Sequence, residues 1–428
     1  MVEEEYKPRV IDSLLGRKLR GKGAVLIEGA KWCGKTSTAE QQANSVIYMS
    51  DPKFRDQYHL FVDTNPEMIL EGDIPRLIDE WQETPKLWDL IRFEVDHRKG
   101  MGHFILTGSS VPAQLDEILH TGTGRFAWLT MRPMSLWESG DSNGKVSLRE
   151  LFHSPGNITA TCEIDLRKVA FLVCRGGWPQ AALMSEDKDI ALDQAIDYYD
   201  AVVNSDIQRV DGVSRDPERV KQLMRSYARF QGSQSSFAAI CKDMEVNDRT
   251  GLDENTIGSY LNALRKIFVV EEMPAWNPNL RSKTAIRTMN TRYFVDPSIA
   301  TAALGLGPED LMTDLETFGL LFETLCVRDL RVFAQVLDGE VYHYRDKTGL
   351  ECDTVVHLRN GSYGLIEIKL GGERLIEEGA KTLSALAEKI DTDKMKEPAF
   401  LTVLTATGSF AYRRKDGVYV VPIGCLKD

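Results

Sequence analysis

The segment that most restricts the fold is a glycine-rich run near the N-terminus, Gly29-Ala30-Lys31-Trp32-Cys33-Gly34-Lys35-Thr36, which follows the apolar residues 24–27. Its spacing is G-x-x-x-x-G-K-[ST], typical of a loop between a strand and a helix that surrounds phosphate groups. In such a loop the backbone N–H groups bind the phosphates, Lys35 reaches the β and γ groups, and the Thr36 hydroxyl holds Mg²⁺. The run therefore predicts an α/β nucleotide-binding domain with ATP and Mg²⁺ as cofactors.

A second motif, Leu77-Ile78-Asp79-Glu80, places two acids at the end of a short apolar strand. Asp79 is predicted to support the metal, and Glu80 to orient the attacking water and accept its proton. A glycine turn beside a surface lysine is the alternative interpretation of the first run. Because the acids supply the second half of a triphosphatase site, the two motifs together favour ATP hydrolysis.

The seven cysteines are scattered singly and show neither metal-ligand spacing nor a paired framework. Cys33 lies inside the loop, where a small buried filler is favoured over a site of regulatory oxidation. No apolar run approaches the roughly 18 residues of a membrane helix, and the acidic residues 3–5 are unlike the start of a signal peptide. We expect a cytoplasmic chain without a membrane partner.

The formal net charge is −12, which argues against a surface coated with phosphate-binding cations. A local basic channel is compatible with that charge. Any DNA or RNA partner must therefore be recognised by particular residues.

The order of apolar and polar segments predicts four domains. Residues 1–160 alternate between strands and helices, as in a mostly parallel sheet with a P-loop. Residues 161–215 are predicted to be a helical lid or connector. Residues 216–290 carry three short helices and the strand-like run Phe268–Met273, the pattern of a winged-helix-like module. Residues 291–428 form a separate α/β domain.

The third helix of the predicted winged-helix module has two interpretations, DNA binding and packing. Its first turn carries Asp253 and Glu254, which would face phosphates unfavourably, so packing or subunit contact is favoured. Lys283, Arg287 and Arg292 are candidates for a basic wing.

Near the C-terminus, Asp353 leads into one predicted strand, and Glu367 and Lys369 alternate along the next. A hairpin would bring Asp353 near Glu367, and the helix 315–334 offers Glu323 as a further ligand. Carboxylates sharing a divalent metal beside a lysine are suited to phosphodiester hydrolysis. The alternative is a half-exposed hairpin with ordinary charge alternation, and spacing leaves both open.

These motifs, together with Ile105-Leu106-Thr107-Gly108-Ser109-Ser110 and Gly124-Arg125, resemble archaeal and bacterial AAA-type ATPases that carry a C-terminal PD-(D/E)XK nuclease-like domain, a restriction-endonuclease-like α/β fold. The resemblance implies that Thr107 or Ser109 is a polar sensor of the γ-phosphate. It also implies that Arg125 is an arginine finger, acting within the chain or across the interface of a homo-oligomer. A surface ion pair is the alternative for Arg125.

In the tail, the same resemblance implies that Glu323, Asp353 and Glu367 are metal ligands and that Lys369 is a catalytic lysine. Cys352 stands where the motif has proline before Asp353. The resulting hypothesis is a Mg²⁺-dependent ATPase coupled to nucleic-acid processing by a nuclease-like domain. The alternative is a nucleotide-controlled switch or assembly ATPase whose C-terminal domain is a catalytically inactive binding module.

Overall fold

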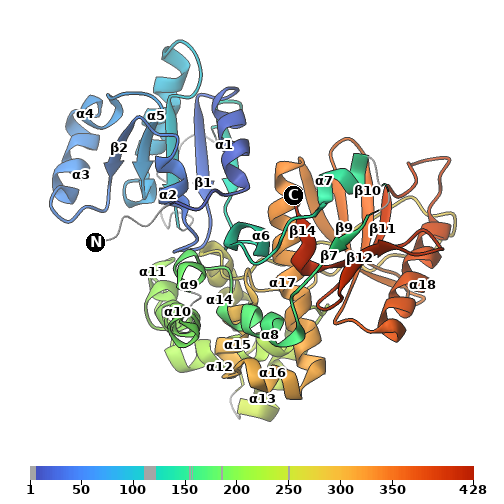
Figure 1. Cartoon of the computed structure of the whole chain (residues 1–428). Coiled ribbons are helices and arrows are strands. Elements are labelled where there is room, and N and C mark those ends of the chain that lie inside the picture. Colours follow the sequence, from blue (N-terminus) through green and yellow to red (C-terminus); the bar gives the residue numbers. More distant parts are fainter. Residues whose placement is uncertain (1–5, 110–121, 154–155, 157, 185–186, 249–250) are drawn as a thin grey trace. The chain divides into compact units, whose positions relative to one another are not determined.

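The computed structural model describes residues 6–109, 122–153, 156, 158–184, 187–248 and 251–428. The chain forms two compact units. The N-terminal unit comprises Met1–Arg132, Asn204–Arg215 and Asn262–Val269, and the C-terminal unit comprises Pro133–Val203, Asp216–Leu261 and Val270–Asp428. Figure 1 shows the sheet of the first unit mainly in blue and that of the second mainly in orange and red.

The N-terminal unit is built on a five-stranded parallel sheet with the order β2-β3-β4-β1-β5. Its strands are β1 (Ala24–Glu28), β2 (Ser45–Tyr48), β3 (Arg76–Asp79), β4 (Phe104–Gly108) and β5 (Phe126–Thr130). Because neighbouring strands are parallel and in register, all five carboxyl ends lie at one edge, where ligands of open α/β sheets bind. The predicted P-loop α/β sheet is confirmed.

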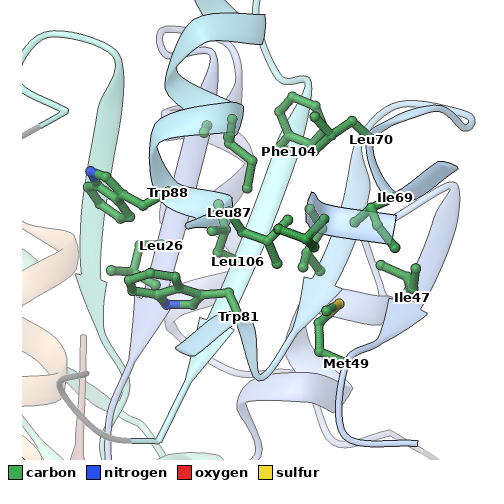
Figure 2. Packing of buried hydrophobic residues seen from close by; sticks show 14 of the residues in the cluster. Leu26, Ile47, Met49, Ile69, Leu70, Trp81, Leu87, Trp88, Phe104 and Leu106 are labelled. Carbon is green, nitrogen blue, oxygen red and sulfur yellow. The ribbon is translucent and has the colours of Figure 1, made fainter. Parts of the chain in front are cut away.

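Apolar side chains on one face of this sheet pack against helical residues that follow β3. Figure 2 shows Trp81, Leu87 and Trp88 near Leu26 and Leu106 in a buried cluster. The helices of this unit are α1 (Ile11–Leu19), α2 (Lys35–Glu40), α3 (Arg55–Thr64), α4 (Glu67–Leu70), the 3₁₀ turn Trp81–Glu83, α5 (Leu87–His97) and α11 (Ile207–Arg209). The continuous apolar runs of the strands suit a sheet that helices cover.

The C-terminal unit contains a seven-stranded mixed sheet with the order β7-β12-β13-β11-β10-β9-β8. Strands β8, β9 and β10 are antiparallel neighbours, whereas β10, β11 and β13 run parallel. The strands are β7 (Ala160–Thr161), β8 (Gly339–Arg345), β9 (Glu351–Leu358), β10 (Tyr363–Lys369), β11 (Phe400–Thr405), β12 (Phe410–Arg413) and β13 (Tyr419–Pro422). Helix α18 (Glu373–Lys389) buries Ala380, Leu383 and Leu386 against this sheet.

Helices occupy most of the sequence from residue 136 to 336, including the stretches predicted to be helical within 161–215 and 216–290. Up to residue 209 they are α6 (Leu136–Ser139), α7 (Leu148–His153), α8 (Leu166–Arg175), α9 (Pro179–Leu183), α10 (Lys188–Ala201) and a π-helix (Val202–Asp206). The later helices are α12 (Pro217–Arg229), α13 (Phe237–Asp248), α14 (Glu254–Lys266), α15 (Pro297–Leu304), α16 (Pro308–Thr313) and α17 (Leu315–Val336). No helix among the described residues is long and apolar enough to cross a membrane.

The compact units differ from the four expected segments. Residues 133–161 fold with the C-terminal unit because β6 (Val146–Ser147) pairs with β14 (Leu426–Lys427) and β7 pairs with β12. The first segment of the N-terminal unit therefore ends at Arg132, well before the expected boundary at 160. These strand partners lie far along the sequence, which local patterns do not reveal.

The predicted strand Phe268–Met273 is wrong as a continuous element. Phe268 has a left-handed backbone with φ +58°, which breaks the extended run. Beyond it, Val270 and Met273 make single antiparallel bridges to Phe294 and Thr291. The three predicted helices are present, and the winged-helix character of the module stays a prediction.

Candidate nucleotide site and a second acidic cluster

The glycine-rich run forms the loop that connects β1 to α2 at the carboxyl edge of the N-terminal sheet. Gly29 has φ +152°, and a Cβ atom there would lie 2.0 Å from the carbonyl oxygen of Met131. Gly34 has φ +99° at the start of α2. Both positions favour glycine, because a side chain would clash at the first and strain the backbone at the second.

Lys35 lies almost wholly inside this loop, with 5% of its surface exposed. Its Nζ donates hydrogen bonds to the carbonyl oxygens of Gly29 at 3.0 Å and Ala30 at 2.8 Å. Among the described residues no carboxylate pairs with this ammonium. A buried cation held by neutral carbonyls is suited to an anionic ligand, because ion pairing would offset its desolvation.

Two hydroxyl groups hold Asp79, the acid that is predicted to support the metal. Asp79 Oδ1 accepts hydrogen bonds from Thr36 Oγ1 at 2.7 Å and Thr107 Oγ1 at 2.6 Å. The structure therefore brings together β3, β4 and the first turn of α2 at one carboxylate. Thr36 and Asp79 supply the hard oxygen donors that Mg²⁺ prefers, so these residues fit the metal implied by the loop.

The second acid, Glu80, is held separately. Its Oε2 accepts a hydrogen bond from Ser109 Oγ at 3.1 Å and another from the Gln82 side-chain amide. Glu80 also has φ +53°, a left-handed conformation that costs a non-glycine residue about 1–3 kcal/mol. Such strain directly after β3 motivates the hypothesis that the backbone orients the Glu80 carboxylate for a functional role.

The two candidate sensors, Thr107 and Ser109, thus contact one acid each in this structure. Their predicted role as sensors of the γ-phosphate stays a prediction. Ser110, in the same motif, lies outside the described residues. Gln82 was missed by the sequence analysis, because an amide two residues after an acid carries no recognisable pattern.

Further side chains fix the loop from outside the motif. The thiol of Cys33 is buried and lies 3.4 Å from the carbonyl oxygen of Met131, which suits a loop filler. Arg9 is also buried, and its guanidinium donates to the carbonyl oxygens of Cys33 at 2.7 Å and Arg132 at 2.8 Å. Arg9 was not recognised from the sequence, since it precedes the loop by some twenty residues.

The loop also carries an unexpected ion pair. Lys31 Nζ lies 2.6 Å from Oδ1 of Asp206, which ends the π-helix in the segment Asn204–Arg215. That segment belongs to the same compact unit as the loop. Trp32, the next residue, has φ +62° and is 64% exposed. Loop residue Lys31 is therefore held by a carboxylate that lies 175 positions later in the chain.

Arg125 lies at the other end of the sheet. It immediately precedes β5, whose first residue, Phe126, is in register with Ala24 at the start of β1. The phosphate loop follows the opposite end of β1, about 17 Å away for five strand residues. The Arg125 guanidinium pairs with both oxygens of Asp96, at 2.8 and 3.1 Å. This structure does not bring Arg125 to the loop of its own chain, and a role across a subunit interface stays a prediction.

In the C-terminal unit, the predicted hairpin of β9 and β10 is present. Its antiparallel register pairs Ile366 with Thr354 and so places Glu367 opposite Asp353. Lys369 Nζ lies 2.7 Å from Oε2 of Glu367 and 3.0 Å from Oδ2 of Asp353. Burial and the Asp353 carboxylate raise the pKa of Glu367 to about 8. The structure thus gathers two carboxylates around one ammonium.

Glu323 on α17 is partly exposed and accepts a hydrogen bond from the hydroxyl of buried Tyr293. Burial of its carboxyl group, followed by the charge of Asp353, raises the pKa of Glu323. A Cβ atom on Gly232 would lie 3.1 Å from both Glu323 carboxyl oxygens. Across the described residues, no three His, Cys, Asp or Glu side chains are arranged to hold a metal ion. The assignment of Glu323 as a metal ligand stays a prediction.

A parallel sheet whose first strand leads into a glycine-rich loop with a buried lysine, facing an acid on β3, defines a P-loop nucleotide-binding domain. Residues 21–139 match the family model of an AAA domain. This part of the chain is similar to AAA domains. Residues 166–310 and 318–426 match two domains of unknown function, DUF8612 and DUF4143.

Several solved structures are similar to parts of this chain. A Walker-type ATPase of Pyrococcus abyssi is 14% identical and covers 70% of this chain and 97% of its own, with a TM-score of 0.43. The ORC2 protein of Aeropyrum pernix is 13% identical over 64% of this chain and 90% of its own, with a TM-score of 0.29. RuvB of Thermotoga maritima is 13% identical over 62% and 89%, with a TM-score of 0.25. No curated protein matches the chain.

Proposed function

We propose that this protein binds ATP with Mg²⁺ at the loop after β1 and hydrolyses it. The observation that carries the proposal is the shared carboxyl edge of β1, β3 and β4. There the buried Lys35 donates hydrogen bonds to two loop carbonyls, and the hydroxyls of Thr36 and Thr107 both donate to Asp79. A polar site of this kind suits a polyanion with a divalent cation.

Each side chain has a distinct role in the proposed reaction. The loop N–H groups and Lys35 bind and neutralise the phosphates, and Thr36 and Asp79 hold the metal, which supplies charge neutralisation. Glu80 accepts the proton of the attacking water. Ser109 and Gln82 fix the carboxylate of Glu80 in this proposal, so that proton acceptance needs little rearrangement.

The direct test is phosphate release from ATP in the presence of Mg²⁺, measured for the intact protein and for Lys35→Ala. The matched control is Lys99→Ala, because Lys99 is an exposed lysine in the same compact unit. We expect turnover by the wild type and the control, with loss of ATP binding and turnover in Lys35→Ala. Turnover that survives in Lys35→Ala would contradict the assignment of the site.

A second candidate function, cleavage of a nucleic-acid phosphodiester by the C-terminal unit, is favoured by the convergence of Asp353, Glu367 and Lys369. Lys369 would stabilise negative charge on the scissile phosphate. The ammonium now lies between the carboxylates that a divalent ion would share, so we assign no catalytic step to a metal here. The alternative is an inactive binding module under nucleotide control.

Cleavage of labelled DNA and RNA, with Mg²⁺ or Mn²⁺ and with or without ATP, separates these alternatives. The variants are Asp353→Asn in the cluster and Asp393→Asn as an exposed control in the same unit. Loss of cleavage in Asp353→Asn alone would support a nuclease. Absence of cleavage in the wild type, with ATP turnover intact, would favour the binding module.

Arg125 would act as an arginine finger only in a homo-oligomer. Its exposed ion pair with Asp96 would have to be exchanged for a phosphate of a neighbouring subunit. Such an arrangement predicts that Arg125→Ala lowers turnover only under conditions in which the protein self-associates. Turnover measured across a range of protein concentrations, beside sedimentation data, tests this role.

A further inference from the structure

Three stretches of the C-terminal unit that carry exposed or half-buried cations lie side by side, despite the chain's net charge of −12. The N–H of Arg281 donates to the carbonyl of Lys389 at 2.7 Å, and the N–H of Arg287 donates to that of Arg345 at 2.9 Å. Between them, the N–H of Lys347 donates to Ala285 O at 3.1 Å. We call the cations on these neighbouring stretches the basic surface: Arg281, Lys283, Arg287, Arg345, Lys347 and Lys389.

Several of these charges are available to a ligand. Lys283, Arg287 and Lys347 are exposed, and within the described part of the chain none of them has an ion-pair partner. Arg281 donates a hydrogen bond to the Thr392 hydroxyl at 2.8 Å, which leaves its charge unneutralised by that contact. Like charges on neighbouring segments repel one another, so the surface is suited to a ligand that carries several negative charges.

The acids around the basic surface are mostly engaged. Asp346 is buried and pairs with Lys389 at 2.8 Å, and Asp391 pairs with Lys394 at 2.8 Å. Glu351 pairs with Arg345 at 3.6 Å. The cations therefore exceed the acids that face them, and the surface keeps a local positive charge.

The side chains between the cations are mainly small hydroxyls. Ser282 and Thr288 are exposed, and Ser282 lies 2.9 Å from the Thr284 hydroxyl. Hydroxyls interleaved with Arg and Lys are the groups that contact phosphates in nucleic-acid complexes. Guanidinium groups add bidentate recognition of phosphate oxygens.

The basic surface adjoins the acidic cluster of the hairpin. Glu351, the partner of Arg345, lies on β9 two residues before Asp353, and residues at that spacing share a face of the strand. The antiparallel pairs of β9 and β10 end at Ile366 and Thr354, and continuation of that register would place Lys369 opposite Glu351. A strand of nucleic acid lying on the cations would therefore reach the cluster.

We propose that the basic surface binds the phosphate backbone of a nucleic acid and directs it to the Asp353–Glu367–Lys369 cluster. Binding of nucleic acid to the basic surface does not depend on ATP hydrolysis. Only its direction toward the cluster rests on the second candidate function. Arg292, expected beside Lys283 and Arg287 in a basic wing, is not part of the surface. It is buried and paired with Glu272.

The test is binding of fluorescein-labelled single-stranded and duplex DNA to the full chain in EDTA, measured by anisotropy from 50 to 300 mM KCl. One variant combines Lys283→Ala, Arg287→Ala and Lys347→Ala. The control removes three cations of α8 and α12 in the same unit, each of which has an ion-pair partner, as Arg167→Ala, Arg219→Ala and Lys221→Ala. Thermal unfolding of each variant verifies its fold.

We expect affinity to fall with salt for the wild type and the control. Three lost phosphate contacts should reduce the magnitude of the log–log salt slope by about 2–3 and weaken binding at 100 mM KCl about 100-fold. Equal binding by the wild type and the surface variant would overturn the proposal, as would an equal loss in the control. Binding of heparin or an acidic peptide, but not DNA or RNA, through these residues would also overturn it. Salt-sensitive binding without any cleavage would retain the surface and reject the second candidate function.

Discussion

Substitution of Gly29 by alanine is the sharpest test of how the phosphate loop is built. The added Cβ would lie 2.0 Å from Met131 O, and ordinary van der Waals contact begins at 3.4 Å, so the two backbones must separate by 3.4 − 2.0 = 1.4 Å. That separation opposes the hydrogen bond of 2.7 Å from the N–H of Met131 to the carbonyl of Glu28. Overpacking costs about 1–3 kcal/mol and the φ of +152° about as much again.

We therefore expect Gly29→Ala to distort the loop and weaken ATP binding by about 2–6 kcal/mol, which is roughly 30-fold or more. The control is Gly100→Ala, because Gly100 has φ +95° and no atom within 4 Å of its added Cβ. Fluorescent-ATP anisotropy measures the affinity, and thermal unfolding measures the stability of both variants. If Gly29→Ala binds ATP no worse than Gly100→Ala, the close approach of Met131 does not shape the loop.

Further predictions concern separate contacts. Thr107→Val keeps the side-chain shape but removes a hydrogen bond to the metal-side carboxylate, so ATP turnover should fall about 10- to 100-fold while the fold is retained; steady-state phosphate release at saturating ATP measures this. Asp206→Asn removes the carboxylate that holds Lys31, so the loop becomes more positive and ATP should bind several-fold tighter, whereas a loss of affinity would show that the pair positions Lys31 for binding. Burial alone would raise the pKa of Asp346, but Lys389 and further hydrogen bonds lower it from 3.8 to about 2. A lowered carboxyl pKa contributes stability above the unfolded value, and that stability is lost as pH falls toward 2. The excess urea resistance of the wild type over Asp346→Asn should therefore shrink below about pH 4, and an excess that stays constant from pH 6 to 3 would contradict the pairing.

The parts of the site that local sequence predicts are those fixed by neighbours in the chain. The apolar run 24–27 and the short apolar strand before Glu80 are found as β1 and β3, because buried parallel strands are continuous apolar segments. The loop and the Asp79–Glu80 pair follow strand ends, so parallel register alone brings them to one edge. The hairpin register likewise follows from alternation along β9 and β10.

Contacts between distant segments could not be predicted in this way. Lys31 and Asp206 are 175 residues apart, and no periodicity connects a loop lysine to a π-helix. The strands β6 and β14 pair across nearly the whole length of the C-terminal unit. Arg292 was expected in an exposed basic wing because of its charge, but it pairs with Glu272 inside the unit. The sequence does not distinguish such a buried pair from two exposed ions.

The proposed ATP hydrolysis is tested most directly by measuring ATP binding and ATP turnover in Glu80→Gln. Because the carboxylate is proposed to accept a proton and not to bind phosphate, we expect near-normal ATP affinity with turnover reduced about 10²- to 10⁴-fold. The control is Glu83→Gln, an exposed glutamate three residues later, which should match the wild type. Unchanged turnover in Glu80→Gln, or loss of ATP binding together with turnover, would contradict the account.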